Sequence, residues 1–324
     1  MSKKLYTTDS QISSLSIDPF KQYGRQVSNT PIPIPTARLL LERQLRTEGL
    51  RDRTVYDYLM WFDKFVESTG VKVVSEINAT AVYQWLEQMD VKNSTKLVRL
   101  KSLKAVLGRF FDRGWIPDKF WKSIKIKVDT PTKKGTDPQD LEIYLNMLDL
   151  TNYFELRDAV AVLLMYKTGI RSATMSQLKE EHLDLDNLLL RLSGDIMKNR
   201  QSLILPIDSQ LVSLIKTLLK ENIKIRQHTK QSNSYLFISR TGRSIYETGH
   251  SNVIQKRLNT FSNKYGIKNI NPHSLRRAYA KNLYNRGANV ALISKALDHK
   301  SLEVTTRYLD ITQEELVSSL REFL

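Results

Sequence analysis

The sequence predicts a mainly α-helical protein with a small β-sheet, built as two domains. Apolar residues recur every three or four positions through most of the chain, which is the spacing of amphipathic helices. Only a short stretch between residues 188 and 207 has the composition of two β-strands joined by a loop. With 324 residues, the chain is long enough for two domains that each bury a core. A segment with prolines, a glycine and lysines, residues 127–140, lies between them as a linker.

Residues 1–35 are predicted to form an extended N-terminal tether. They contain Ser, Thr and Gln, and they end in the run PIPIP from Pro31 to Pro35. Alternating prolines fix φ and remove backbone donors, so this run is expected to be extended rather than helical. The helical pattern is expected to begin at Thr36.

Residues 36–126 are predicted to form a domain of four helices. The first, TARLLLERQLRTEG, ends at Gly49, and the second, RTVYDYLMWFDKFVESTG, ends at Gly70, because glycine commonly terminates helices. The third, NATAVYQWLEQM, begins at Asn78, a residue type that caps helix N-termini. The fourth, NSTKLVRLKSLKAVLGRFFDRG, has leucines at helical spacing on one side and basic residues on the other.

The basic side of the fourth helix allows two interpretations. A basic helix face is usually a solvated surface, but the overall charge of the chain makes nucleic-acid binding an equal alternative. The DNA-binding residues predicted on this helix are Lys96, Arg99, Lys101 and Lys104. In the linker we add Lys133 and Lys134, and the adjacent Gly135 suggests either a close backbone approach or a turn that a bulky residue would strain. Together these residues predict that the two domains close as a clamp around a duplex.

Residues 141–324 are predicted to form the second domain, with a tail helix at its C-terminal end. A long apolar helix, FELRDAVAVLLMYKTGI, ends at Gly169. Two strands, 188–192 and 202–207, enclose a loop that holds Lys198, and YLFIS at 235–239 has the composition of a third strand. The segments after residue 251 are predicted to be helical, and the tail reads LDITQEELVSSLREFL.

Composition narrows the classes of function. Lys plus Arg number 50 against 34 for Asp plus Glu, and the resulting net charge of +16 favours a polyanionic partner such as nucleic acid. No apolar run approaches the ~18–20 residues that span a bilayer, and no amphipathic terminal stretch suits a membrane surface. The absence of cysteine excludes disulfides, thiol nucleophiles and zinc–thiolate sites. With no secretory signal in the sequence, a cytoplasmic location is expected.

Metal-free cleavage of a phosphodiester requires three kinds of group. Arginines stabilise charge on the non-bridging oxygens, a nucleophile attacks phosphorus, and a general acid protonates the leaving alkoxide. The second domain offers a set of such residues, namely Arg171, Lys198, His273, Arg276, His299 and Tyr308. His273 and Arg276, three positions apart after an Asn-Pro pair, are expected to share one face at a helix start that attracts anions.

These residues stand in motifs that resemble those of the tyrosine recombinase (phage integrase) family. The matching pieces are TGIR with Arg171, HSLRR with His273 and Arg276, LDHKS with His299, and TTRYLDIT with Tyr308. Lys198 lies in the expected hairpin, eight positions before Pro206, where the family keeps its catalytic lysine. The resemblance covers about residues 36–324. It implies a helical core-binding (SAM-like) DNA-binding domain, 36–126, followed by a recombinase catalytic domain, 141–324.

The resemblance also implies a role for each residue of the set. Tyr308 would attack the scissile phosphate and form a 3′-phosphotyrosyl link, releasing a 5′-hydroxyl. Arg171 and Arg276 would hold the non-bridging oxygens of that phosphate. His273 would assist proton transfer on the tyrosine, and His299 would hydrogen-bond the phosphate.

Lys198 would protonate the leaving 5′-oxygen. Because the covalent link conserves the energy of the cleaved diester, the resemblance implies neither a metal nor a nucleotide cofactor. The implied partner is double-stranded DNA, on which protomers would assemble from dimer to tetramer through the C-terminal tail. The resemblance therefore places the protein at the nucleoid and implies no membrane partner.

Two positions depart from the family pattern. Thr174 stands where the family usually has glutamate, and Asp298 precedes His299 where the family usually has glycine. A carboxylate beside a phosphate-binding histidine adds repulsion, on the order of a kcal/mol. The departures keep an alternative open: a sequence-specific DNA-binding repressor of a phage or mobile element, which retains the fold without strand exchange. A type IB topoisomerase has similar chemistry, but the compact hairpin and the tail after Tyr308 fit recombinases better.

Overall fold

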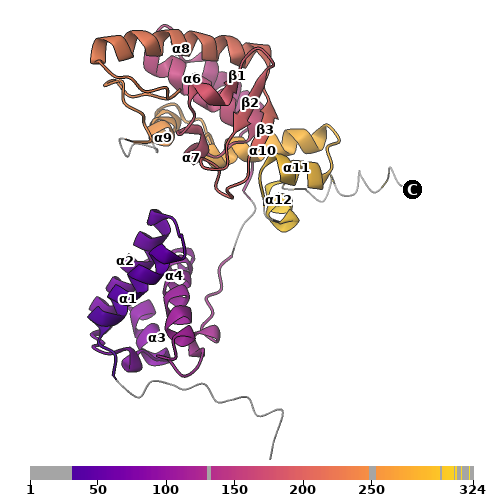
Figure 1. Cartoon of the computed structure of the whole chain (residues 1–324). Helices are drawn as coiled ribbons and strands as arrows, with labels where there is room; N and C mark the ends of the chain where they lie inside the picture. The colour runs from indigo at the N-terminus through magenta and orange to yellow at the C-terminus, as the bar shows by residue number, and fades with distance from the viewer. Residues whose placement is uncertain are drawn as a thin grey trace, which may run out of the picture. The chain divides into compact units, whose positions relative to one another are not determined.

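The computed structural model describes residues 31–129, 133–247, 253–299 and 301–309, and the single residues Ile311, Glu315 and Arg321. The chain divides into two compact units, residues 1–130 and 131–324, which are drawn in Figure 1. Within these described ranges, no helix is both long enough and apolar enough to cross a membrane. Most of the predicted tether, and the apolar tail residues Leu316, Leu320, Phe323 and Leu324, lie outside the described residues.

The first unit is a bundle of helices. Its elements are α1 (Ile34–Thr47), α2 (Asp52–Thr69), η1 (Val74–Glu76), α3 (Ala79–Glu87), α4 (Asn93–Asp112) and η2 (Phe120–Lys122). The four predicted helices are confirmed, with one correction at the start of the bundle. α1 begins at Ile34, inside the predicted tether, because proline is tolerated in a first helical turn, where its missing N–H has no intrahelical partner.

Aromatic side chains form the centre of this bundle. Phe62 of α2 meets Phe110 of α4 edge to face, with ring centroids 5.4 Å apart, and Phe65 meets Trp85 of α3 at 5.7 Å. All four rings are buried among the leucines that the helical periodicity places inward. The predicted N-cap Asn78 is confirmed, since its side chain accepts a hydrogen bond from a backbone N–H of α3 at 3.0 Å.

The second unit contains more helices and a small sheet. Its helices are α5 (Pro138–Asn146), α6 (Tyr153–Thr168), α7 (Ser172–Met175), η3 (Glu180–His182), α8 (Ser209–Thr229), α9 (Val253–Tyr265), α10 (Pro272–Asn285), α11 (Val290–Ala296) and α12 (Leu302–Leu309). Its strands are β1 (Leu183–Asp184), β2 (Leu189–Leu192) and β3 (Leu203–Pro206). The apolar helix α6 packs against α8 and α10, and Figure 1 shows it beside α8. It therefore forms the centre of the unit.

The strands form one antiparallel sheet in the order β1–β2–β3. β2 and β3 are the predicted hairpin, in which Leu190 lies opposite Leu205. The predicted third strand at 235–239 is wrong, because that segment forms only isolated bridges and β1 completes the sheet instead. Side chains of α6 and α8 donate hydrogen bonds to backbone carbonyls of this segment. These carbonyls therefore have partners without a neighbouring strand.

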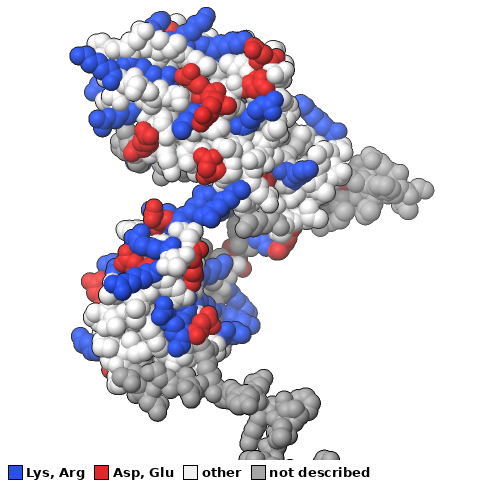
Figure 2. Space-filling view, in the orientation of Figure 1, with Lys and Arg blue, Asp and Glu red and all other residues white. Residues whose placement is uncertain are grey.

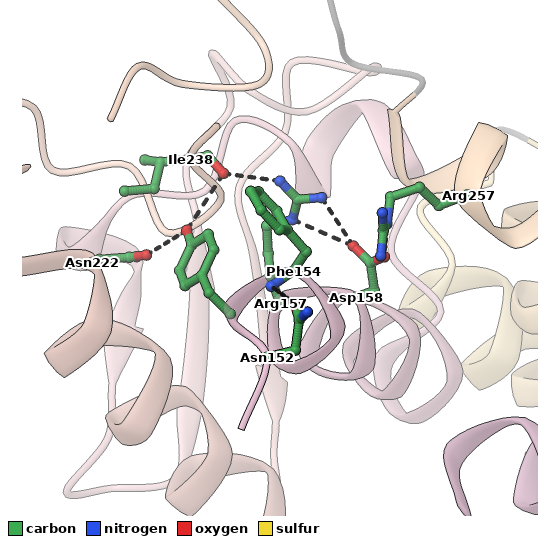
Figure 3. Close-up of polar contacts among 8 residues, drawn as sticks. Asn152, Phe154, Arg157, Asp158, Asn222, Ile238 and Arg257 are labelled. Carbon is green, nitrogen blue, oxygen red and sulfur yellow. Dashed lines mark hydrogen bonds and ion pairs between the residues drawn. The ribbon is translucent and has the colours of Figure 1, made fainter. Parts of the chain in front are cut away.

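A buried polar network lies at the start of α6 (Figure 3). Arg157, which is 2% exposed, donates to the Ile238 carbonyl at 3.0 Å and to the Asp158 carboxylate at 3.1 Å. Asp158 is equally buried and also pairs with Arg257 of α9. Phe154 lies 5.2 Å from the guanidinium of Arg157 and 5.9 Å from that of Arg257. One carboxylate thus joins two arginines and ties α9 to α6.

A smaller apolar cluster joins the last helices to α10. It consists of Ala280, Ile293, Leu297 and Leu309, with Tyr308 packed against it. Because α10 also packs on α6, three pieces of chain meet on one side of the unit: the end of α6, the start of α10 and the turn after α11. Four residues of the predicted site, Arg171, His273, Arg276 and His299, stand on or next to these pieces, whereas Tyr308 lies on α12 and Lys198 lies between β2 and β3.

Candidate active site

Arg276 is buried at the centre of the candidate site. It lies on α10 and is 4% exposed, and it donates through Nη1 to the Gly169 carbonyl at 2.6 Å and through Nη2 to the Leu297 carbonyl. Gly169 ends α6 in a left-handed conformation (φ 65°) and Leu297 ends α11, so both acceptors are carbonyls that helix ends leave free. The Nε of Arg276 is buried and finds no hydrogen-bond partner within the described part of the chain. Both acceptors are neutral, so these bonds leave the guanidinium charge uncancelled.

Arg171 follows α6 and faces the turn after α11. Its Nη1 donates to the Asp298 carboxylate and its Nη2 to the Asp298 carbonyl, each at 3.1 Å. Asp298 has a φ of 50°, a left-handed conformation that aspartate tolerates better than most residues and glycine adopts freely. The sequence predicts that this carboxylate repels phosphate beside His299. The ion pair with Arg171 is an additional finding that the sequence does not predict.

His299 and Tyr308 lie side by side. Their rings meet edge to face, with centroids 5.0 Å apart, and His299 Nδ1 is 2.9 Å from the hydroxyl of Thr305 on α12. The guanidinium of Arg277 lies 5.8 Å from the centre of the Tyr308 ring. Tyr308 is half-buried and lines an open pocket of about 450 Å³ together with α10 residues such as Lys281. The packing fixes the tyrosine ring while leaving one side of it accessible.

His273 stands in the first turn of α10 and is exposed. The predicted cap is confirmed, because the Asn271 side chain accepts hydrogen bonds from the N–H groups of His273 at 3.1 Å and Ser274 at 3.0 Å. The pKa of His273 is lowered, first by partial desolvation and then by Arg277 and Arg276. A neutral histidine beside arginines at a helix N-terminus suits the binding of an anion.

Arg171 and Arg276, which we call the arginine clamp, lower the pKa values of the groups around them. The pKa of Arg276 is lowered to about 10 by burial and then by Arg171, while Tyr308 acts in the opposite direction. The pKa of His299 is lowered to about 4 by burial and then by Arg276 and Arg171. His299 is therefore neutral near pH 7, and the arginines carry the positive charge of the site. In the part of the chain that the structure describes, no group of three or more His, Asp and Glu side chains could hold a metal ion.

Lys198 stands in the loop between β2 and β3 and is exposed. The loop folds as a turn in which the Arg200 N–H donates to the Met197 carbonyl at 3.2 Å. Asn199, next to Lys198, donates to the Asp298 carbonyl at 2.8 Å. The structure therefore brings the loop of Lys198 to the same turn that Arg171 contacts, at the edge of the site.

The end of the predicted linker is docked on α10. The Thr136 N–H donates to the Ser274 carbonyl at 3.1 Å. A β-carbon added at Gly135 would lie 2.8 Å from the backbone nitrogen of Ala278, so the close approach predicted for Gly135 is confirmed. The linker also ends before residue 140, because α5 begins at Pro138 with Pro in its first turn.

This docking brings the two linker lysines to the start of α10. The Lys134 carbonyl accepts a hydrogen bond from Arg277 at 3.2 Å, and Lys133 is among the charges that lower the pKa of His273. Contact of these lysines with DNA stays a prediction. Given where these lysines lie, such a contact would be made beside the candidate site.

The basic residues of α4 are largely engaged within the first unit. Lys96 and Lys104 donate to backbone carbonyls at 2.8 and 2.6 Å, and Arg99 stacks on the ring of Trp61 at 4.4 Å. Lys101 is exposed. On the face drawn in Figure 2, basic side chains are interspersed with acidic ones over both units. DNA binding by these four residues stays a prediction, and it would require three of them to contact DNA while keeping internal contacts.

Sequence reasoning missed two residues of the site, Asn199 and Thr305. Asn199 stands next to Lys198 outside any motif, and its contact with Asp298 is distant in sequence. Thr305 opens the TTRYLDIT motif, but nothing in the sequence shows its contact with His299 across the turn. Thr174, flagged as a departure, is buried, and its hydroxyl lies 3.4 Å from the Ile196 carbonyl in the hairpin loop. A short polar side chain there reaches the loop that holds Lys198.

Known proteins share sequence similarity with the part of the chain that holds these residues. The phage integrase family model matches residues 138–315, more than half of the chain. The chain belongs to this family. Two relatives that it resembles are named tyrosine recombinases. It is 24% identical over 285 residues to XerC of Staphylococcus haemolyticus (86% of this chain, 91% of the relative), and 24% identical over 281 residues to XerD of Chlamydia trachomatis serovar D (85% and 91%).

Solved structures of this family share the fold. The structure of the Tn1549 transposon integrase in complex with transposon right end DNA is similar, with a TM-score of 0.70 at 16% sequence identity. The likeness covers 89% of this chain and 99% of that chain. The predicted fold class, mainly α with a small sheet, and the predicted family are therefore confirmed. The roles of the individual site residues stay predictions.

Proposed function

We propose that this family member is a site-specific tyrosine recombinase, which cuts and rejoins double-stranded DNA through a 3′-phosphotyrosyl intermediate. The observation that carries the proposal is the setting of Arg276, buried against neutral carbonyls beside the His299–Tyr308 pair. A phosphodiester would supply the negative charge that this arginine lacks. Its tyrosine neighbour supplies a nucleophile for the same phosphate.

In the cleavage step, the Tyr308 hydroxyl oxygen attacks the scissile phosphorus, and the bond from phosphorus to the 5′-oxygen breaks. His273, neutral near pH 7, accepts the tyrosine proton, and Lys198 gives a proton to the departing 5′-oxygen. The products are a 3′-phosphotyrosine and a 5′-hydroxyl. Rejoining reverses these transfers, with a 5′-hydroxyl as nucleophile, so no external energy source is consumed.

The phosphate would be held by three side chains. Arg171 and Arg276 donate to the non-bridging oxygens, on which charge accumulates in the transition state. His299 would donate from Nε2 in the tautomer whose Nδ1 accepts a hydrogen bond from the Thr305 hydroxyl. A neutral histidine in this role adds a hydrogen bond without adding a further charge to the arginine pair.

Double-stranded DNA is the partner that best fits the chain. The similar integrase structure is a complex with DNA, and the net charge of +16 suits a polyanion. We assign the helical core-binding domain to the predicted residues 36–126, extended back to Ile34 by α1, and the catalytic domain to residues 141–324, extended back to Pro138 by α5. A nucleoid-associated location follows from this partner.

Assembly on DNA through the C-terminal tail is a further part of the proposal. In the single chain, Glu315 pairs with Lys281 of α10 at 2.6 Å, so the start of the tail contacts its own unit. The predicted apolar tail residues, Leu316, Leu320 and Phe323 or Leu324, lie outside the described residues. Deleting the residues after Thr312 should preserve binding to a single site and abolish cooperative binding to paired sites in a mobility-shift titration.

The ion pair of Arg171 with Asp298 is the feature that favours the repressor alternative. A carboxylate already bound to this arginine competes with the phosphate for it. The recombinase remains the better conclusion, because the family match and the named relatives support it and Arg276 stays uncompensated by its hydrogen bonds.

Covalent trapping separates the two functions. Duplexes that the purified protein selects from a random-sequence pool would be labelled, nicked near the selected site, and mixed with wild type or with Tyr308→Phe. The recombinase predicts a labelled band of protein size on a denaturing gel for wild type only, with equal binding by both proteins. A wild type that binds the selected duplex tightly and forms no such band would establish the repressor instead.

A further inference from the structure

We propose that Asn199 is a positioning residue, which fixes the loop of Lys198 against the arginine clamp. The inference rests on the proposed DNA cleavage, because it concerns how the general acid of that reaction is held in place. A general acid must reach its leaving oxygen to within hydrogen-bond distance. Lys198 stands on a loop between two strands, and loops are the mobile parts of a fold unless they are tied down.

One carbonyl oxygen connects the loop to the clamp. The side-chain amide of Asn199 donates to the Asp298 carbonyl at 2.8 Å, and Arg171 donates to the same oxygen at 3.1 Å. A carbonyl oxygen has two lone pairs, so it can accept both bonds. The left-handed backbone of Asp298 (φ 50°) sets the direction of this carbonyl. Asn199 therefore fixes the loop relative to an arginine that would bind the scissile phosphate.

The other side of Lys198 is held by packing. Met197 is 3% exposed, and its carbonyl accepts the N–H of Arg200 at 3.2 Å, which closes a turn with Lys198 and Asn199 at its two central positions. A β-carbon added at Gly194 would lie 2.7 Å from the Arg200 carbonyl, so the base of the loop is also closed tightly. Lys198 thus stands between a buried side chain and a tethered one. Its own side chain is exposed.

Loss of the Asn199 amide should act on Lys198 and not on the clamp. Arg171 keeps its bond to the Asp298 carboxylate, and Arg276 is held by carbonyls that Asn199 does not touch. Arg200, rather than Asn199, has the left-handed conformation of the turn (φ 58°), so replacing Asn199 introduces no backbone strain. The defect should therefore be confined to protonation of the leaving oxygen.

The test compares two leaving groups on the same nicked duplex, selected by the wild-type protein. One duplex carries the ordinary phosphodiester, and the other carries sulfur in place of the bridging 5′-oxygen, whose thiolate leaves without a proton. The variants are Asn199→Ala and the nearly isosteric Asn199→Leu, which lacks the donor and adds no charge. Asn187→Ala is the control, because Asn187 donates at 2.9 Å to the Asp184 carboxylate in the other turn of the same sheet.

For both Asn199 variants we expect covalent attachment to the ordinary duplex to slow by about 10- to 100-fold, the cost of misplacing a catalytic group by roughly 1 Å. On the sulfur duplex the rate should return to within about threefold of wild type, and DNA affinity should stay unchanged. Lys198→Ala should show the same pattern, and adding Asn199→Ala to it should slow the reaction no further, because both changes remove one function.

The outcomes separate the inference from the function on which it rests. If wild type forms no adduct with either duplex, the proposed cleavage fails and the role of Asn199 fails with it. If wild type cleaves and the Asn199 variants match Asn187→Ala, only the positioning role is overturned. A defect that the sulfur duplex does not relieve would also overturn it, because the damage would then lie in the clamp.

Discussion

Two buried arginines in the second unit differ in how their charge is balanced. Arg157, at 2% exposed, shares the Asp158 carboxylate with Arg257, so a full negative charge lies within hydrogen-bond distance of both (Figure 3). Arg276, at 4% exposed, donates to carbonyls at helix ends, and among the described residues its buried Nε has no hydrogen-bond partner. Arg157 donates to a charged carboxylate, whereas the two carbonyls to which Arg276 donates are neutral.

This difference distinguishes a structural ion pair from a binding site. Burying a cation without a counter-ion costs free energy, and the lowered pKa of Arg276, about 10, reports that cost. Such a residue persists when a ligand supplies the missing charge. The Arg157 network needs no ligand, because Asp158 already supplies the negative charge. The network attaches α9 to α6.

The largest effect is expected from Arg276→Ala. Covalent attachment to nicked DNA should fall by about 10³-fold or more, because a donor aimed at the developing phosphorane charge is lost. The free energy of unfolding should change by less than about 1 kcal/mol, since the lost hydrogen bonds and the relieved desolvation oppose each other. Urea unfolding and adduct formation measure the two quantities. A variant that unfolds readily would make Arg276 a structural residue like Arg157.

The reverse result is expected from Asp158→Asn. Removing the charge of one partner from a buried ion pair costs about 3–5 kcal/mol of unfolding free energy, because the two arginines lose their counter-ion. Cleavage by the folded fraction should be unchanged. Asp186→Asn, at an exposed position, serves as the control and should leave stability within about 0.5 kcal/mol. Equal stability of the two variants would contradict the role assigned to Asp158.

A smaller effect is expected from Asp298→Asn. Asparagine tolerates the left-handed conformation, and its backbone carbonyl still accepts from Arg171 and Asn199, so only the carboxylate charge is lost. Arg171 then becomes available to phosphate, and DNA affinity should rise by about three- to tenfold. The slope of log K against log salt should steepen by about one phosphate contact. Weaker binding by this variant would show that the carboxylate orients Arg171 rather than competing for it.

The smallest effect is a pH dependence set by His299. Its pKa is lowered to about 4 in the folded protein from an ordinary value near 6.5, by burial and then by the two arginines. The unfolded chain therefore binds the extra proton first, so stability is fully present above pH 6.5 and is lost as pH falls towards 4. His299→Gln should flatten the acid side of the unfolding profile relative to wild type. Identical profiles would show that neither burial nor the arginines lower the pKa of His299.

The helices were the most predictable part of the fold. Leucine and aromatic periodicity located the elements of the first unit, and glycine and asparagine located their ends, because these signals are local. The strand predicted at 235–239 was wrong, since a short apolar run does not show whether its carbonyls pair with a strand or with side chains. The adjacent Arg157 and Asp158 were hidden inside an apolar helix, because their partner Arg257 lies far along the chain.

The site was predictable as a set of residues but not as an arrangement. Motifs name Arg171, Arg276 and Tyr308, and the structure brings them together with His299. They do not show that Asp298 pairs with Arg171 across 127 positions. Nor do they show that Lys96 and Lys104 donate to carbonyls of their own unit, because an unpaired carbonyl at the end of an element leaves no mark in composition.

The setting of Arg276 also bears on how this protein can evolve. Its acceptors are main-chain oxygens at the ends of α6 and α11, so its position depends on where these helices stop and on few side chains. Substitutions on DNA-facing surfaces can therefore change the sequence that is recognised while the chemistry is inherited intact. A single-residue insertion within α6 would instead rotate its terminal carbonyl by about 100°. Lineages of this protein should thus accept drift in target sequence and reject length changes in these two helices.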